Sequence, residues 1–152
     1  MTPYTKTEDG FELQFGVNHL AHFLMTNLLL KENLINENGG RIVVVASRAH
    51  RFVKGIRFED LNWEKDYNKK AAYGQSKLAN IYFAKELDKR LKSQGKNIVA
   101  VALHPGVGRC CTDKSAFAKF QNHYLRKPSI FLYNGSNKFS RTINCSGIIC
   151  RA

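Results

Sequence analysis

Two apolar runs constrain the fold of this chain most strongly. Residues 41–47 read Arg-Ile-Val-Val-Val-Ala-Ser, and residues 97–103 read Asn-Ile-Val-Ala-Val-Ala-Leu. The first run holds four β-branched residues in succession, which disfavour a helix and favour a strand. Neither run alternates with polar residues, and this is typical of strands that are covered on both faces in a parallel sheet. The sequence therefore predicts two parallel strands.

A helix is predicted between the two runs, as a parallel pair requires. Apolar residues recur at helical spacing over residues 71–93 at Leu78, Ile81, Leu87 and Leu91. Gly95 follows as a helix stop. Residues 48–70 form a long polar connection, a length that is usual for functional loops. Strand, helix and strand together make a βαβ unit, whose crossover is right-handed in nearly all known cases.

An earlier helix is predicted over residues 9–31. Its apolar residues at helical spacing are Phe11, Phe15, Leu20, Phe23, Leu24 and Leu28. Thr5 and Glu8 have the spacing of a capping box just before it. Residues 33–40 are rich in Asn and Gly and end the helix. The order helix, strand, helix, strand indicates an α/β fold.

The positive charge is concentrated at one end of the chain. The net charge is +12 over 152 residues, a balance that can indicate nucleic-acid binding. Residues 105–152, however, hold eight Lys and Arg against Asp113 alone, together with all four cysteines. We therefore expect an α/β domain over residues 1–106 and a divergent, basic, poorly ordered tail over residues 107–152, with no nucleic-acid partner.

The sequence also bears on the location of the protein. No apolar run approaches the ~20 residues of a membrane-spanning helix. The segment from Met1 to Thr7 lacks the apolar core of a secretory signal. We expect a cytoplasmic protein, although a longer form of it could associate with membranes.

Polar residues that could carry chemistry follow both predicted strands. Ligands of open α/β sheets bind at the carboxyl ends of the strands, where Ser47 and His104 stand. On the second helix, Tyr73 and Lys77 are four residues apart and share one face. A phenol is a poor base near neutrality, but a fixed cation nearby favours the phenolate. Such a pair suits acid–base catalysis between a hydroxyl and a carbonyl, with Ser47 donating a hydrogen bond to the carbonyl oxygen. A solvated lysine beside a half-buried tyrosine is the structural alternative.

Four segments together resemble a known family. They are Gly16-Val17-Asn18-His19-Leu20-Ala21-His22-Phe23, Val43-Val44-Val45-Ala46-Ser47-Arg48-Ala49-His50, Ala72-Tyr73-Gly74-Gln75-Ser76-Lys77-Leu78-Ala79-Asn80 and His104-Pro105-Gly106. Over residues 3–106 the chain resembles the short-chain dehydrogenases/reductases, most closely their retinol dehydrogenase-like branch. The resemblance implies a partial, doubly wound Rossmann-like parallel sheet that corresponds to the C-terminal half of the family's domain.

The resemblance implies a catalytic tetrad. Tyr73 would exchange the proton, Lys77 would favour its phenolate and hold the nicotinamide ribose, Ser47 would position the substrate oxygen, and Asn18 would hold a water for proton relay. Tyr73, Lys77 and the turn His104-Pro105-Gly106 would contact NADP or NAD. The expected reaction is the NAD(P)-dependent interconversion of an alcohol and a carbonyl on a small, lipophilic, retinol- or retinal-like substrate.

The resemblance also bears on partners and metals. In this family the two long helices, predicted here over residues 9–31 and 71–93, form the interface of a homo-oligomer. His19 and His22 are three residues apart on a helix, but no third ligand with suitable spacing accompanies them. We expect no metal site.

One element of the family is not found in this sequence. The family's glycine-rich turn holds the cofactor pyrophosphate, and no three of the 11 glycines have its spacing. We therefore expect the isolated chain to be inactive as an oxidoreductase. The alternative is a truncated, non-catalytic remnant that at most dimerises with intact relatives.

Overall fold

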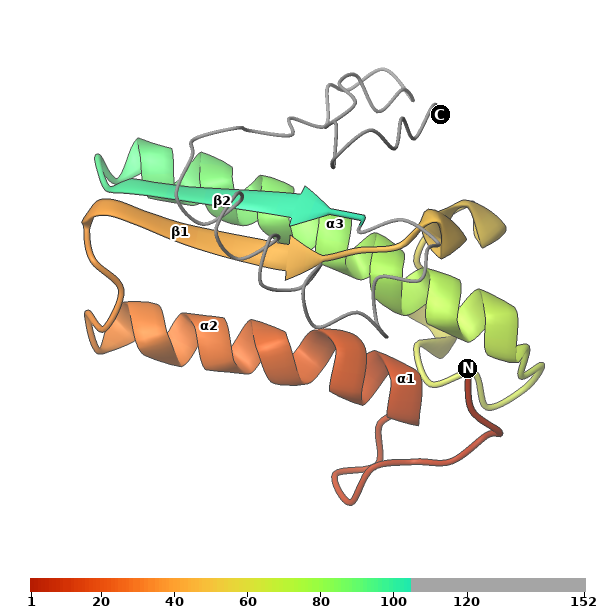
Figure 1. Ribbon diagram of the computed structural model, residues 1–152. Coiled ribbons are helices and arrows are strands. Elements are labelled where there is room, and N and C mark those ends of the chain that lie inside the picture. The colour runs from red at the N-terminus through yellow and green to blue at the C-terminus, as the bar shows by residue number, and fades with distance from the viewer. Residues whose placement is uncertain (105–152) are drawn as a thin grey trace, which may run out of the picture. The chain divides into compact units, whose positions relative to one another are not determined.

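The computed structural model describes residues 1–104, which include both predicted strands. Strands β1 (Asn38–Val45) and β2 (Asn97–Leu103) lie side by side and run parallel (Figure 1). Arg41 is opposite Val99 and Val45 is opposite Leu103. The predicted parallel pair and the α/β class are confirmed. The predicted domain boundary after residue 106, the turn residues Pro105 and Gly106, and the tail over residues 107–152 lie outside the described residues.

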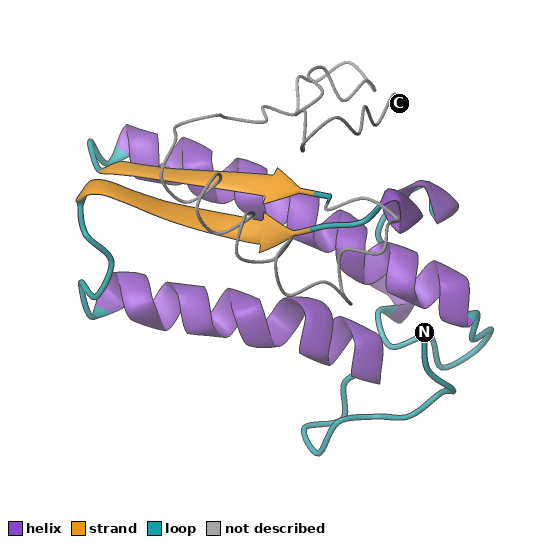
Figure 2. Ribbon diagram, in the orientation of Figure 1, coloured by secondary structure: helices purple, strands orange, loops and turns teal. Residues whose placement is uncertain are grey.

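Two long helical segments accompany the strands (Figure 2). The first consists of α1 (Leu13–Phe15), a π-helical turn η1 (Gly16–Leu20) and α2 (Ala21–Lys31). The second is α3 (Lys69–Ser93), which packs against both strands. Two short 3₁₀ helices, η2 (Arg48–Phe52) and η3 (Phe58–Asp60), occupy the predicted long connection.

The observed element boundaries correct several predictions. The first helix begins at Leu13 rather than at residue 9, because the Glu12 carboxylate, and not a box of Thr5 and Glu8, accepts from the first free backbone N–H groups. The second begins at Lys69 rather than at residue 71, because the Asn68 side chain caps it. Strand β1 spans residues 38–45 instead of 41–47, which leaves Ser47 just beyond the strand.

The core lies where α3 covers the strands. Leu87 and Leu91 of α3 are buried against Ile98 and Ala100 of β2. Leu30, Ile35, Ile42 and Phe83 pack around this cluster. The apolar stripe predicted for α3 therefore faces the sheet. This packing also fixes the other end of α3, which carries Tyr73 and Lys77, at the carboxyl ends of the strands.

The close approach of α3 to η2 requires a glycine. A Cβ on Gly74 would lie 2.5 Å from the Ala49 backbone oxygen and 3.4 Å from the Phe52 Cβ. Gly74 follows Tyr73, and Ala49 stands two residues after Ser47. The contact therefore joins the segments that carry these two catalytic candidates.

Replacing this glycine should destabilise the protein. We expect Gly74→Ala to cost about 1–3 kcal/mol, because the added methyl group must displace backbone. Gly55→Ala is the matched control, since nothing lies within 4 Å of the Cβ it would add, and it should stay within about 0.5 kcal/mol of the parent. Urea unfolding followed by circular dichroism measures both. Equal stabilities of the two variants would contradict the close-packing account.

Candidate active site

Ser47 stands at the carboxyl end of β1 as the N-cap of η2. Its Oγ accepts a hydrogen bond from the Ala49 backbone N–H at 3.2 Å, and its backbone oxygen accepts from the His50 N–H at 3.1 Å. A hydroxyl can accept and donate at the same time. Because the cap uses only the acceptor side of Oγ, the Ser47 O–H proton remains available for a substrate oxygen.

Tyr73 and Lys77 lie one turn apart on α3, as their spacing predicts. The Lys77 Nζ lies 5.7 Å from the centre of the Tyr73 ring. The same ammonium donates to the Val45 backbone oxygen at 3.1 Å, which ties α3 to the last residue of β1. Burial lowers the pKa of Lys77 from its ordinary value. The chain thus holds a half-buried cation beside the phenol ring, bound to the backbone of Val45, which stands two residues before Ser47.

Asn18 reaches the same part of α3 from the other helical segment. Its Nδ2 donates to the Ser76 Oγ at 3.0 Å, and Ser76 Oγ donates to the Tyr73 backbone oxygen at 2.8 Å. Asn18 sits in the middle of η1, and π-helical turns of this kind are frequent at functional sites. The contacts of Asn18 with α3 run through Ser76 and, at its backbone oxygen, through Asn80 Nδ2 at 3.0 Å.

Sequence reasoning missed Ser76 and Asn80. Both are polar, yet Ser76 is 0% and Asn80 3% exposed. Their spacing could have identified them. Ser76 lies three residues after Tyr73 and Asn80 three residues after Lys77, so each is a neighbour of a candidate residue on the helix surface. Buried polar side chains at such positions are usually hydrogen-bonded, and here they connect the candidate residues.

His104 directly follows the last residue of β2, at the same edge of the sheet as Ser47. Both ring nitrogens are buried and have no hydrogen-bond partner among residues 1–104. Burial, the charge of Arg48 and the charge of His50 lower the pKa of His104. A neutral imidazole without a partner can bind a polar group that arrives with a ligand. Of the predicted turn His104-Pro105-Gly106, only His104 falls within the described residues.

Acid should destabilise the fold through two partly buried histidines, His19 and His104. Burial lowers the pKa of His19, as it does for His104. A histidine with a lowered pKa binds its proton more readily in the unfolded chain, so stability falls as the pH drops below the unfolded value of about 6.5. We expect the melting temperature to fall between pH 7 and pH 5 by on the order of a few degrees. The fall should be clearly smaller in His19→Phe. It should be only slightly smaller in His22→Phe, which keeps His19 and removes the weakest of the causes that lower its pKa. Calorimetry with identical slopes for all three proteins would contradict this assignment.

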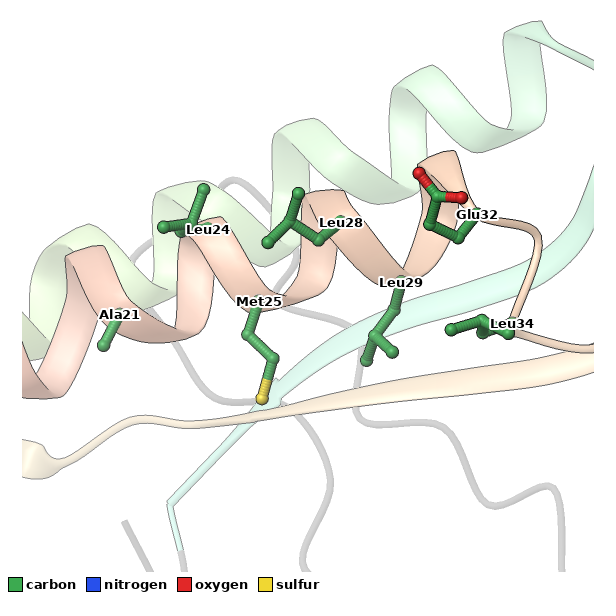
Figure 3. Close-up of a pocket in the computed structure, with 7 residues that line it drawn as sticks. All are labelled: Ala21, Leu24, Met25, Leu28, Leu29, Glu32 and Leu34. Carbon is green, nitrogen blue, oxygen red and sulfur yellow. The ribbon is translucent and has the colours of Figure 1, made fainter.

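An apolar groove runs along the outer side of α2 (Figure 3). It is lined by Ala21, Leu24, Met25, Leu28, Leu29, Glu32 and Leu34. Leu24 is 59%, Met25 52% and Leu34 69% exposed. An apolar surface of this kind marks an interaction site more often than a solvated face.

The residues at the sheet edge fit the nicotinamide end of a dinucleotide. Lys77 has three N–H donors, and its bond to Val45 uses one of them, so two can serve ribose hydroxyls. The unpartnered ring of His104 offers a further polar contact. The predicted ribose and nicotinamide contacts stay predictions, which these free donors and the unpartnered ring would suit. The sequence contains no glycine turn for the pyrophosphate.

Two further properties concern residues 1–104 alone. None of their helices combines the length and apolar character needed to cross a bilayer. These residues also bring together no group of three or more His, Cys, Asp or Glu that could hold a metal ion. The cytoplasmic location stays a prediction.

Comparisons with known proteins agree with the geometry. A family model described as short chain dehydrogenase matches residues 2–119. Retinol dehydrogenase 14 of Mus musculus is 56% identical over 108 residues, which are 70% of this chain and 31% of that protein. Retinol dehydrogenase 13 of Homo sapiens is 57% identical over 109 residues, 70% of this chain and 31% of that protein. The chain spans about a third of the length of these relatives.

A solved structure is similar as well. It is the crystal structure of an uncharacterized protein from Mycobacterium paratuberculosis, with a TM-score of 0.68 and 42% sequence identity. The match covers 85% of this chain and 47% of that one.

Proposed function

Because the chain belongs to the short-chain dehydrogenase family, in its retinol dehydrogenase-like branch, we propose that it carries the proton-transfer half of an NAD(P)-dependent oxidoreductase. The reaction is the interconversion of an alcohol and a carbonyl. The observation that supports it best is the Lys77 ammonium, which is held on the Val45 backbone oxygen at 3.1 Å and 5.7 Å from the Tyr73 ring centre.

The side chains divide the work in the direction of carbonyl reduction. The Tyr73 hydroxyl donates its proton to the substrate oxygen, and the Ser47 hydroxyl donates a hydrogen bond to the same oxygen. The Lys77 ammonium stabilises the phenolate that forms when Tyr73 gives up its proton. Asn18, held on α3 through Ser76, positions a water through which Lys77 exchanges protons with solvent. In alcohol oxidation the same groups move the proton in reverse.

The cofactor is NADP or NAD, which supplies or accepts the hydride when bound. Lys77 and Tyr73 would hold its ribose, and His104 would contact its nicotinamide together with Pro105 and Gly106, the two predicted contacts outside the described residues. The substrate is a small lipophilic alcohol or aldehyde of the retinoid kind. The names of the relatives, retinol dehydrogenases 13 and 14, support this class.

A chimera tests the function. The segment of mouse retinol dehydrogenase 14 that precedes its match to this chain is joined to Met1, and the product is assayed with NADPH and all-trans-retinal. We expect NADPH-dependent formation of retinol by the chimera and none by the 152-residue chain alone, which has no glycine turn. A folded chimera that binds NADPH yet reduces no aldehyde would refute the proposal.

A homo-oligomer formed through the two helical segments is the second part of the proposal, and a non-catalytic dimerising module is the alternative function. The exposed apolar groove on α2 supports association in either case.

Charge on the groove should abolish this association. We expect the chain to sediment as a dimer and Leu24→Glu to sediment as a monomer, because a carboxylate in an apolar interface is desolvated without a partner. Glu37→Gln is a surface control outside the groove and should leave the dimer intact. Monomeric sedimentation of the unmodified chain at all concentrations would contradict the second part of the proposal.

A further inference from the structure

The buried side chain of Asn80 lies where three elements meet. Its Nδ2 donates to the Asn18 backbone oxygen in η1 at 3.0 Å and to the Val45 backbone oxygen at the end of β1 at 3.2 Å. The Val45 oxygen is also the acceptor for Lys77. One amide on α3 therefore binds the backbone of one tetrad candidate and shares an acceptor with another.

Hydrogen-bond chemistry fixes the orientation of this amide. Backbone oxygens only accept, so the NH₂ group of Asn80 must face Asn18 and Val45, and its Oδ1 must point away from them. That Oδ1 lies 3.0 Å from the His19 Nδ1. Since an amide oxygen also only accepts, the His19 Nδ1 must carry the proton.

The surroundings of His19 suit this role. The ring centre lies 5.2 Å from that of Phe15 and 6.2 Å from that of Phe83, so packing restrains the ring from both helical segments. Burial and the nearby charge of His22 lower the pKa of His19, although its bond to Asn80 opposes them. A neutral imidazole protonated on Nδ1 is thus the form that the site holds at neutral pH.

We propose that His19 and Asn80 are a positioning pair for the proton-transfer site: the Nδ1–H of His19 orients the Asn80 amide, and this amide fixes the backbone oxygen of Asn18 and the Val45 oxygen that anchors Lys77. This inference rests on the proposed function, because Asn18 and Lys77 need fixed positions only if they relay protons. Neither residue of the pair touches the reacting atoms.

The first test uses the unmodified chain. In a ¹⁵N-labelled sample at neutral pH, long-range ¹H–¹⁵N correlations should show His19 as a neutral ring with its proton on Nδ1. This measurement needs no variant and so does not depend on the folding of one. A proton on Nε2 would overturn the proposal. Nδ1 would then carry a lone pair, and the Asn80 amide oxygen would have to face either that lone pair or the two backbone oxygens, all of which only accept hydrogen bonds.

The second test follows Lys77 in variants of the pair. Asn80→Leu keeps the shape of the side chain and removes its donors. Without the hydrogen bonds of Asn80, the Lys77 ammonium should move toward solvent. Its pKa, measured from ¹³Cε shifts, should then rise toward the ordinary value. Asn27→Leu, which removes an exposed amide bonded within α2, should leave the pKa of Lys77 unchanged. An unchanged or lower pKa of Lys77 in folded Asn80→Leu would overturn the proposal.

Conservative replacement at His19 separates orientation from packing. His19→Phe keeps a packed ring and removes the donor, whereas His19→Asn can place an amide N–H where Nδ1 stood. We expect the pKa of Lys77 to rise in His19→Phe and to remain near its original value in His19→Asn. Equal values in the two variants would mean that the ring only packs. None of these readouts requires cofactor, so an inactive chimera with an intact pair would refute the proposed function alone.

Discussion

Tyr73→Phe should reduce retinal reduction by the chimera about 10²–10⁴-fold, the usual contribution of a positioned proton donor. The phenyl ring keeps the shape of the side chain and its position 5.7 Å from Lys77 but has no proton to give. Folding should change little, because no hydrogen bond of the Tyr73 hydroxyl within residues 1–104 contributes to the fold. NADPH affinity should fall only modestly, because Lys77 keeps its ribose contacts when the Tyr73 hydroxyl is lost.

Tyr82→Phe is the matched control for this prediction. Tyr82 is on the same helix and 51% exposed, and its variant should keep the activity of the parent chimera. Steady-state kinetics with NADPH and all-trans-retinal measure both proteins. A Tyr73→Phe chimera that retains more than about a tenth of the parent kcat would exclude Tyr73 as the proton donor.

Glu12→Ala should cause the largest loss of stability, about 2–4 kcal/mol. The Glu12 side chain is fully buried and accepts from the backbone N–H of Gln14 at 2.9 Å and of Phe15 at 2.7 Å. The Tyr67 hydroxyl lies 3.4 Å from the same carboxylate. Truncation leaves the two backbone N–H groups buried without this acceptor, whereas the Tyr67 hydroxyl keeps its bond to the Thr2 backbone oxygen at 3.0 Å. The negative charge at the start of a helical segment is lost as well.

Glu64→Ala provides the control for Glu12. Glu64 pairs with Lys6, and both side chains are largely exposed, so the loss should stay within about 1 kcal/mol. Glu12→Gln retains one oxygen as an acceptor and should lie between the two. Urea unfolding gives the three free energies. A Glu12→Ala protein as stable as Glu64→Ala would show that the N-cap is dispensable.

The strands were predictable because the information is local. Ile42 to Val45 are β-branched and adjacent, and the strand over residues 97–103 is found with the predicted bounds. The helix starts were less predictable. Glu12 lies outside the residues usually preferred as N-caps, whereas Thr5 and Glu8 offered a familiar pattern that the chain does not use.

The connections within the candidate site could not be predicted from local patterns. The i, i+4 spacing of Tyr73 and Lys77 correctly placed the ammonium near the ring. The bonds of Asn18 to Ser76 and Asn80, however, span 58 and 62 residues. The π-helical turn around Asn18 was also hidden, because the apolar spacing on either side of it still fits an ordinary helix.

The most direct test of the central claim is a crystal structure of the chimera with NADP and a bound alcohol. The claim is that Ser47, Tyr73 and Lys77 converge on one reaction centre at the carboxyl ends of the strands. We expect the Ser47 Oγ and the Tyr73 hydroxyl to lie about 2.6–3.2 Å from the same alcohol oxygen, with Lys77 on the ribose. An alcohol oxygen bound by neither hydroxyl, or a Lys77 side chain directed away from Tyr73, would contradict it.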